Sequence, residues 1–204
     1  CRTCVFNSFS VNPKLVEALA GIDLINRFQP DLVIAIGGGS VIDMGKLITC
    51  LQAQESDDYG IIIRYSLITR KGLPLVAVPT TAGTGSEATR FAVVYIDGIK
   101  FSLAHKYILP DYSIVDPSLS CDMPSYQCAV SAMDALCQAV ESYWSVNATE
   151  KSAQYRAKAI TAIKDNIHAA VLYGEKSARE KIAYAANLSG KAIDITQTTA
   201  PHAI

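Results

Sequence analysis

The chain has 204 residues, of which 50% are hydrophobic and 18% are charged. This composition excludes a disordered protein, and the length suffices for one large or two modest cores. Eighteen Lys and Arg residues against 19 Asp and Glu residues give a formal net charge of -1, and no basic tract is long enough to predict nucleic-acid binding. No apolar segment reaches the ~18 residues of a membrane span. We therefore expect neither a nucleic acid nor a membrane as a partner.

Six cysteines are scattered along the chain, at positions 1, 4, 50, 121, 128 and 137. Cys1 and Cys4 are separated by two residues, but no second pair stands at the spacing of a zinc ribbon. Scattered thiols in an α/β chain favour a reducing compartment, so a cytoplasmic location is expected.

Strand and helix patterns alternate along the first part of the chain. A helix is predicted over residues 15–28, with Asn12 as its cap and Pro13 in its first turn. Continuous apolar runs predict parallel strands buried on both faces, at 31–36 and again at 73–78. The remaining predictions are a helix at 41–51, a short strand at 92–95, and a strand-like pair at 114–115 that ends at Asp116-Pro117.

From Ser125 onward the chain is rich in alanine with helical periodicity. Helices are predicted at 128–143, 150–173 and 178–194. The fold class is therefore α/β, with a Rossmann-like, parallel-sheet, nucleotide-binding domain at 1–117 followed by an all-helical domain at 118–204.

Gly37, Gly38, Gly39 and Ser40 follow the first apolar strand. Glycines at the carboxyl end of a strand let backbone amides meet a pyrophosphate, and the dipole of the following helix favours the anion. The alternative is a tight turn, because the run lacks the Gly-x-Gly-x-x-Gly spacing of a dinucleotide fingerprint. Asp43 lies three residues before Lys46 on the next helix, and the ordinary interpretation is that they pair on a solvated face.

A second polar loop, residues 79–87, follows the second apolar strand. Its Thr80, Thr81 and Thr84 are small donors that can line a ribose or a phosphate. Polar ends of parallel strands are where ligands bind. The alternative is a capped helix start, with Glu87 supporting the first turn.

Asp134 and Gln138 lie four residues apart on a predicted helix, so both side chains point in one direction. That spacing suits two ligands of one metal ion, and His202 supplies an imidazole further along the chain. Together with the glycine run, these residues suggest a nucleotide-dependent metalloenzyme. In the alternative, Gln138 only forms a hydrogen bond inside a cleft.

In this order and spacing, the motifs resemble the iron-containing, group III alcohol dehydrogenases over essentially the whole chain. More distant resemblance is to glycerol dehydrogenase and dehydroquinate synthase. The resemblance implies a nucleotide-binding domain, a dehydroquinate synthase-like helical domain and a divalent metal in the cleft between them. It also implies NAD(H)- or NADP(H)-linked interconversion of aldehydes and alcohols.

Carried over by position, the resemblance makes Gly37, Gly38, Gly39 and Ser40 pyrophosphate-binding residues. Asp43, Thr80, Thr81, Thr84 and Lys100 become further cofactor-binding residues. Asp134 and His202 become metal ligands and catalytic residues for Fe(II) or Zn(II). Gln138 stands where the family usually has a histidine, so the metal is held by fewer side chains, is a harder ion, or is absent.

The resemblance also implies that this chain is a fragment, inactive alone. It would begin after the family's first strands and stop before its last metal-binding histidine.

Residues 138–147 and 198–204 resemble the phosphonoacetaldehyde reductase branch, in which glutamine also occurs at the position of Gln138. Arg90 is then a candidate for binding the phosphonate, with a structural ion pair as the alternative. Two other functions stay open: a lyase or cyclase of the dehydroquinate synthase type, which Asp134 disfavours, and a noncatalytic remnant. A homodimer is an open alternative to a monomer.

Overall fold

The computed structural model describes residues 2–199 and 202. They form two compact units. The first contains the chain up to Ile36, Ser40–Ala77 and Arg90–Ser113, and the second contains Gly37–Gly39, Val78–Thr89 and the chain from Ile114 onward. Two loops from the N-terminal half therefore group with the C-terminal helices, and the domain boundary predicted after residue 117 stays a prediction.

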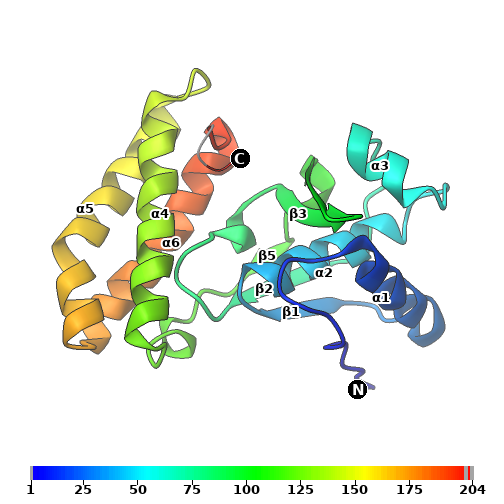
Figure 1. The fold of residues 1–204 in the computed structure, drawn as a ribbon, viewed down its shortest axis with the longest axis horizontal. Helices are drawn as coiled ribbons and strands as arrows, with labels where there is room; N and C mark the ends of the chain where they lie inside the picture. The colour runs from blue at the N-terminus through cyan, green and yellow to red at the C-terminus, as the bar shows by residue number, and fades with distance from the viewer. Residues whose placement is uncertain (1, 200–201, 203–204) are drawn as a thin grey trace. The chain divides into compact units, whose positions relative to one another are not determined.

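A parallel sheet with strand order β1-β2-β5 forms the centre of the α/β part (Figure 1). In chain order the elements here are α1 (Leu15–Phe28), β1 (Val33–Gly37), α2 (Gly39–Leu51), α3 (Tyr59–Tyr65), β2 (Leu75–Pro79), η1 (Ser86–Ala88), β3 (Phe91–Ile96), β4 (Ile99–Ala104), η2 (Lys106–Ile108) and β5 (Tyr112–Ser113). β5 pairs with β2 in parallel. The strand-like pair predicted at 114–115 is wrong, because the strand ends at Ser113.

α2 is the most deeply buried helix of the first unit. Nearly every residue from Ile42 to Leu51 is buried. One side packs on the sheet through Ile42, and Met44 and Leu47 belong to the hydrophobic cluster that also contains Ala18 and Ile22 of α1. A Cβ atom on Gly45 would lie 2.9 Å from Cβ of Ala35 in β1, so a glycine is needed for this close approach.

The first turn of α1 differs from the prediction. The helix begins at Leu15 as expected, but its N-cap is Lys14, and no side chain caps it. Asn12 has a φ of 61°, and its N–H donates to Oγ of Ser40 at 3.1 Å. Asn12 therefore forms a left-handed bend before the helix instead of a cap.

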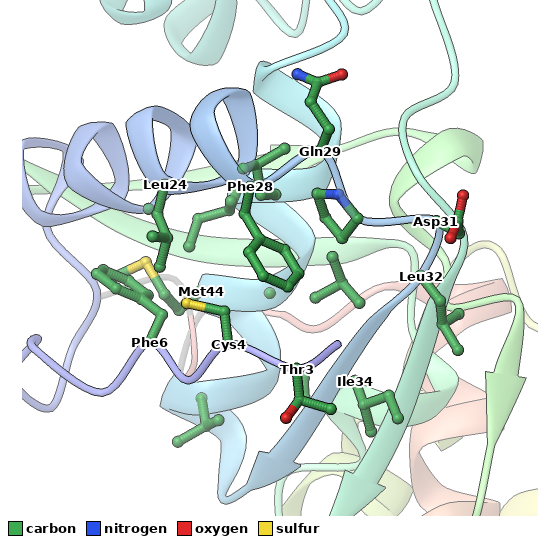
Figure 2. Close-up of a pocket in the computed structure, with 18 of the residues that line it drawn as sticks. Thr3, Cys4, Phe6, Leu24, Phe28, Gln29, Asp31, Leu32, Ile34 and Met44 are labelled. Atoms are coloured by element: carbon green, nitrogen blue, oxygen red, sulfur yellow. The ribbon is translucent and has the colours of Figure 1, made fainter. Parts of the chain in front are cut away.

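β1 is buried on one face. Ala35 is 4% exposed, whereas Ile34 and Ile36 are 55% and 59% exposed, so the prediction of burial on both faces is wrong for the part of the chain that the structure describes. A cavity of about 710 Å³ lies along this strand, with Thr3, Phe6, Phe28 and Ile34 among its lining residues (Figure 2). None of the lining residues belongs to the predicted site.

β3 confirms the strand predicted at 92–95, and it forms an antiparallel hairpin with β4 that was not predicted. Asp97 and Gly98 make the two-residue turn, both with positive φ. Asp-Gly between two strands is a strong hairpin signal, because a type I′ turn needs positive φ at both positions. The sequence thus contained the signal for β4.

The second unit contains η3 (Pro117–Leu119) and the helices α4 (Ser125–Trp144), α5 (Glu150–Leu172) and α6 (Lys176–Thr196), which pack on one another (Figure 1). The predicted helices are confirmed. Small side chains such as Ala135 and Ala139 fill the core with Ile163. α5 begins with a capping box between Thr149 and Ser152, which satisfies two otherwise unpaired amides.

Two negative findings apply to the described residues. No helix among them combines the length and hydropathy needed to cross a membrane. The cysteines at positions 4, 50, 121, 128 and 137 are all free thiols.

Candidate functional site

The glycine run and the threonine loop lie against each other within the second unit. The amide of Thr80 donates to the carbonyl of Gly37 at 2.9 Å. A Cβ atom on Gly38 would lie 3.3 Å from Thr81, and one on Gly39 would lie 2.8 Å from Thr84. The structure therefore brings most of the predicted cofactor residues together, with hydroxyl groups facing a backbone that has no side chains.

α2 begins at Gly39, so the amides of its first turn have no partner within the helix. Its dipole adds a partial positive charge at the same end. Backbone donors at a helix start, beside threonine hydroxyls, are the groups that a pyrophosphate and a ribose require.

The other predicted cofactor residues, Ser40, Asp43 and Lys100, belong to the first unit. Asp43 accepts a hydrogen bond from the amide of Val93 at 3.0 Å and lies 3.9 Å from Nζ of Lys46. Lys46 is fully buried, so the interpretation of this pair as a solvated one is wrong. The pair joins α2 to β3, because Lys46 also donates to the carbonyl of Phe91.

Lys100 is exposed on β4, opposite Tyr95 in the hairpin. The candidate substrate residue Arg90 is exposed just before β3. Both lie in the first unit.

The threonine loop is anchored to the helices at two glycines. A Cβ atom on Gly83 would lie 2.9 Å from Cα of Ser131 in α4, and one on Gly85 would lie 2.6 Å from Cα of Gly190 in α6. Only a three-residue 3-10 helix follows the loop. Glu87 is buried and accepts a hydrogen bond from Asn187 of α6 at 2.9 Å, so its carboxylate also joins the loop to the helices.

Asp134, Gln138 and His202 form a second cluster within the same unit. Nε2 of Gln138 donates to Oδ1 of Asp134 at 3.1 Å, and Nε2 of His202 lies 3.1 Å from the same oxygen. The structure brings all three predicted metal ligands together. No group of three or more His, Cys, Asp and Glu side chains among the described residues is arranged to hold a metal. The candidate ligands in this cluster are thus one carboxylate, one amide and one imidazole.

The amide oxygen of Gln138 has no hydrogen-bond partner although the side chain is 4% exposed. A buried acceptor without a donor costs about 1–3 kcal/mol. The carboxylate of Asp134 can only accept, so the amide nitrogen must face it and the oxygen stays without a donor. Such an oxygen fits a cation.

Glu141 also belongs to this cluster, and the sequence interpretation missed it. It is buried, and Oε1 contacts Nδ1 of His202 while Oε2 accepts from the amide of Thr199 at 2.6 Å. Its spacing, seven residues after Asp134 and three after Gln138, was the available signal, because these positions share one face of a helix.

The charges in the cluster shift two pKa values. The hydrogen bond to Asp134 raises the pKa of His202 above its ordinary value, with burial opposing and Glu141 adding to the rise. Burial acts to raise the pKa of Glu141, but the hydrogen bonds from Thr199 and His202 outweigh it and lower that pKa. Both carboxylates thus favour a positive charge between them.

The fold and these clusters define a class: a parallel α/β sheet followed by a helical unit, with candidate nucleotide loops and a candidate metal cluster. Residues 1–117 match the model of the family "Iron-containing alcohol dehydrogenase". Residues 128–204 match that of the "Fe-containing alcohol dehydrogenase family, C-terminal". The chain belongs to the iron-containing alcohol dehydrogenase family.

Known relatives agree with this assignment. The chain is 38% identical to long-chain-alcohol dehydrogenase 1 of Geobacillus thermodenitrificans over 98% of its own length and 51% of that protein. It is 36% identical to the 1,3-propanediol dehydrogenase of Klebsiella pneumoniae, over 100% of this chain and 53% of that protein. The chain thus spans about half the length of these curated relatives.

A solved structure is similar in fold as well. Sulfoacetaldehyde reductase from Bifidobacterium kashiwanohense, in complex with NAD+, superposes with a TM-score of 0.92 at 32% identity, over 98% of this chain and 54% of that one. The predicted cofactors, a nicotinamide dinucleotide and iron or another divalent metal, agree with the NAD+ of this structure and with the description of the family.

Proposed function

We propose that the full-length gene product is a metal-dependent, NAD(P)-linked alcohol dehydrogenase or aldehyde reductase. The observation that carries the proposal is the unpaired Oε1 of Gln138 beside Asp134 and His202. An anionic oxygen, a neutral amide oxygen and an imidazole nitrogen are a donor set that divalent cations accept.

Asp134, Gln138 and His202 would hold the metal, Fe(II) or Zn(II). A bound divalent ion supplies Lewis acidity at the oxygen of the alcohol or aldehyde. Asp134 offsets part of the positive charge, and His202 binds through a neutral ring nitrogen. Because an amide oxygen is a weaker and harder ligand than imidazole, we expect lower affinity for Fe(II) and Zn(II) than a histidine at this position would give.

The glycine and threonine loops would hold the dinucleotide. Gly38 and Gly39 leave backbone amides open to the pyrophosphate, and Thr81 and Thr84 place hydroxyls next to them. Ser40, Asp43 and Lys100 remain proposed cofactor residues. The chain's own contribution is to fix the cofactor in position for hydride transfer, which the nicotinamide performs.

For the substrate we propose phosphonoacetaldehyde, reduced to 2-hydroxyethylphosphonate. Arg90 would bind the phosphonate, since a guanidinium offers paired donors to two oxygens. The similar structure described above is named a sulfoacetaldehyde reductase. Sulfoacetaldehyde, like phosphonoacetaldehyde, is a two-carbon aldehyde that carries an anionic group. Free thiols support a cytoplasmic location, and a homodimer remains an open alternative.

The test reconstitutes the full-length gene product anaerobically with Fe(II), or with Zn(II), and follows NADH and NADPH absorbance. Phosphonoacetaldehyde, sulfoacetaldehyde, acetaldehyde and butyraldehyde are compared as substrates. We expect a preference for the phosphonate that Arg90→Ala abolishes. Arg70→Ala is the control, because Arg70 is an exposed arginine of the same unit that pairs with Glu55.

Two outcomes would count against the proposal. Turnover of plain aldehydes alone would remove the phosphonate and leave a general alcohol dehydrogenase. No turnover with any divalent ion would overturn the enzymatic function and favour a noncatalytic remnant.

A further inference from the structure

Glu141 is a buried carboxylate on the helix face that carries two of the proposed metal ligands. It lies one turn beyond Gln138 and two turns beyond Asp134 on α4, and it is 2% exposed. Burying an ionised group costs several kcal/mol unless hydrogen bonds satisfy it. The buried carboxylate of Glu141 therefore needs strong hydrogen-bond donors.

Among the described residues, the hydrogen-bond partners of its carboxylate lie in the segment that follows α6. Oε2 accepts from the amide of Thr199 at 2.6 Å and from its hydroxyl at 2.8 Å. Oε1 contacts Nδ1 of His202. One carboxylate thus holds two residues that lie 58 and 61 positions away in the chain.

Glu141 binds this segment beyond the end of α6, where helical hydrogen bonds no longer hold the backbone. α6 ends at Thr196, and Gln197 leaves it with a φ of 61°. Two further hydrogen bonds help to fix this end of α6 and the segment after it. Nε1 of Trp144 donates to the hydroxyl of Thr199 at 3.2 Å, and the hydroxyl of Ser145 donates to the carbonyl of Thr196 at 2.8 Å. Glu141 and Asp134 both contact the ring of His202.

The contact with Glu141 also selects which ring nitrogen of His202 is available. An ionised carboxylate can only accept, so the closer contact, with Glu141, favours the hydrogen on Nδ1. Nε2 lies 3.1 Å from Oδ1 of Asp134, which also only accepts and therefore competes for the hydrogen of the metal-free ring. A cation bound by Asp134 would end this competition and leave Nε2 with its lone pair.

We propose that Glu141 is the positioning residue of the metal site: it clamps the segment after α6 to α4 and presents Nε2 of His202 to the metal. This assignment rests on the metal-dependent function proposed above. Carboxylates that bond to the second nitrogen of a metal-binding histidine typically change metal affinity by 10–100-fold when they are replaced.

The test measures Zn(II) binding to the full-length gene product by calorimetry, and records 15N NMR of the imidazoles in the metal-free protein above the pKa of the ring. Glu141→Gln keeps the shape of the side chain and is expected to weaken Zn(II) binding about 10–100-fold and to shift the ring toward the other tautomer. Glu150→Gln is the control, because it removes the same charge from an exposed position at the start of α5. It should leave both readouts unchanged.

Thr199→Val separates the clamp from the ring contact. It removes the hydroxyl that bonds to Glu141 and keeps the amide bond, so we expect a smaller loss of affinity than in Glu141→Gln and an unchanged tautomer. Wild-type affinity and tautomer in Glu141→Gln would overturn the proposal, as would an equal loss in Thr199→Val. If the wild-type protein itself does not bind Zn(II) or Fe(II), the proposed metal-dependent function fails, whereas the NMR comparison still decides whether Glu141 sets the tautomer.

Discussion

The contact between Gly85 and Gly190 joins the threonine loop to α6, and it can be tested by adding one methyl group to either side. Gly85 has a φ of 61°, and its new Cβ atom would lie 2.6 Å from Cα of Gly190. A Cβ atom on Gly190 would lie 2.6 Å from the carbonyl oxygen of Gly85. Both obstacles are backbone atoms, so no side-chain rotation can relieve the overlap.

The two substitutions have different expected costs. Gly85→Ala pays about 1–2 kcal/mol for the left-handed conformation and about 1–3 kcal/mol for overpacking. Gly190→Ala would gain about 1 kcal/mol from helix propensity if the site had room, but we expect the overlap to make it destabilising. Gly174→Ala is the matched control in the same unit: its φ is 65°, but the nearest atom, on Arg179, is 3.8 Å away, so only the conformational cost remains.

Urea denaturation measures these changes in the free energy of unfolding. Trp144 is the single tryptophan and lies on α4 of the same unit, so its fluorescence follows the relevant transition. We expect Gly85→Ala to be at least 1 kcal/mol more destabilising than Gly174→Ala. The reasoning is refuted if the two cost the same, or if Gly190→Ala stabilises the protein.

Two further predictions concern the first unit and the cofactor loops. Partial burial acts to raise the pKa of Asp111, but hydrogen bonds from Lys71 and from the amide of Leu75 outweigh it and lower the pKa. A lowered pKa in the folded state stabilises the protein above the unfolded pKa of about 3.9, and this contribution is lost as the pH falls through the folded pKa. Asp111→Asn should therefore cost about 1 kcal/mol at neutral pH and progressively less in acid, as measured by denaturation across pH; a difference independent of pH would contradict this. In the loops, Gly39→Ala places a Cβ atom 2.8 Å from Thr84, and calorimetry should show NADH affinity reduced by about tenfold, whereas unchanged affinity would move the pyrophosphate away from this loop.

Local patterns were sufficient for most of the helices. The helix at 15–28 has the predicted bounds, and the long alanine-rich segments form α4, α5 and α6, because helical periodicity is a property of neighbours in the chain. The burial of β1 could not be predicted from its local sequence in the same way. Its apolar run is equally compatible with one or two covered faces, and Ile34 and Ile36 are exposed.

The same distinction holds for the candidate site. Asp134 and Gln138 were predictable as a pair, since residues four apart on a helix share a face, and their hydrogen bond is present. Lys46 was interpreted as solvated from its charge alone, yet it is buried because its ammonium group reaches a carbonyl 45 residues away.

Residue order and spacing were thus enough to predict the family motifs, most of the helices and the candidate ligands on one helix face. The role of Glu141 and the contact between Gly85 and Gly190 were not accessible in that way. Each joins residues more than 50 positions apart, and their chemistry depends on which backbone and side-chain atoms the folded chain brings within van der Waals or hydrogen-bond distance. No local periodicity encodes such contacts, because packing between separate helices and loops determines them.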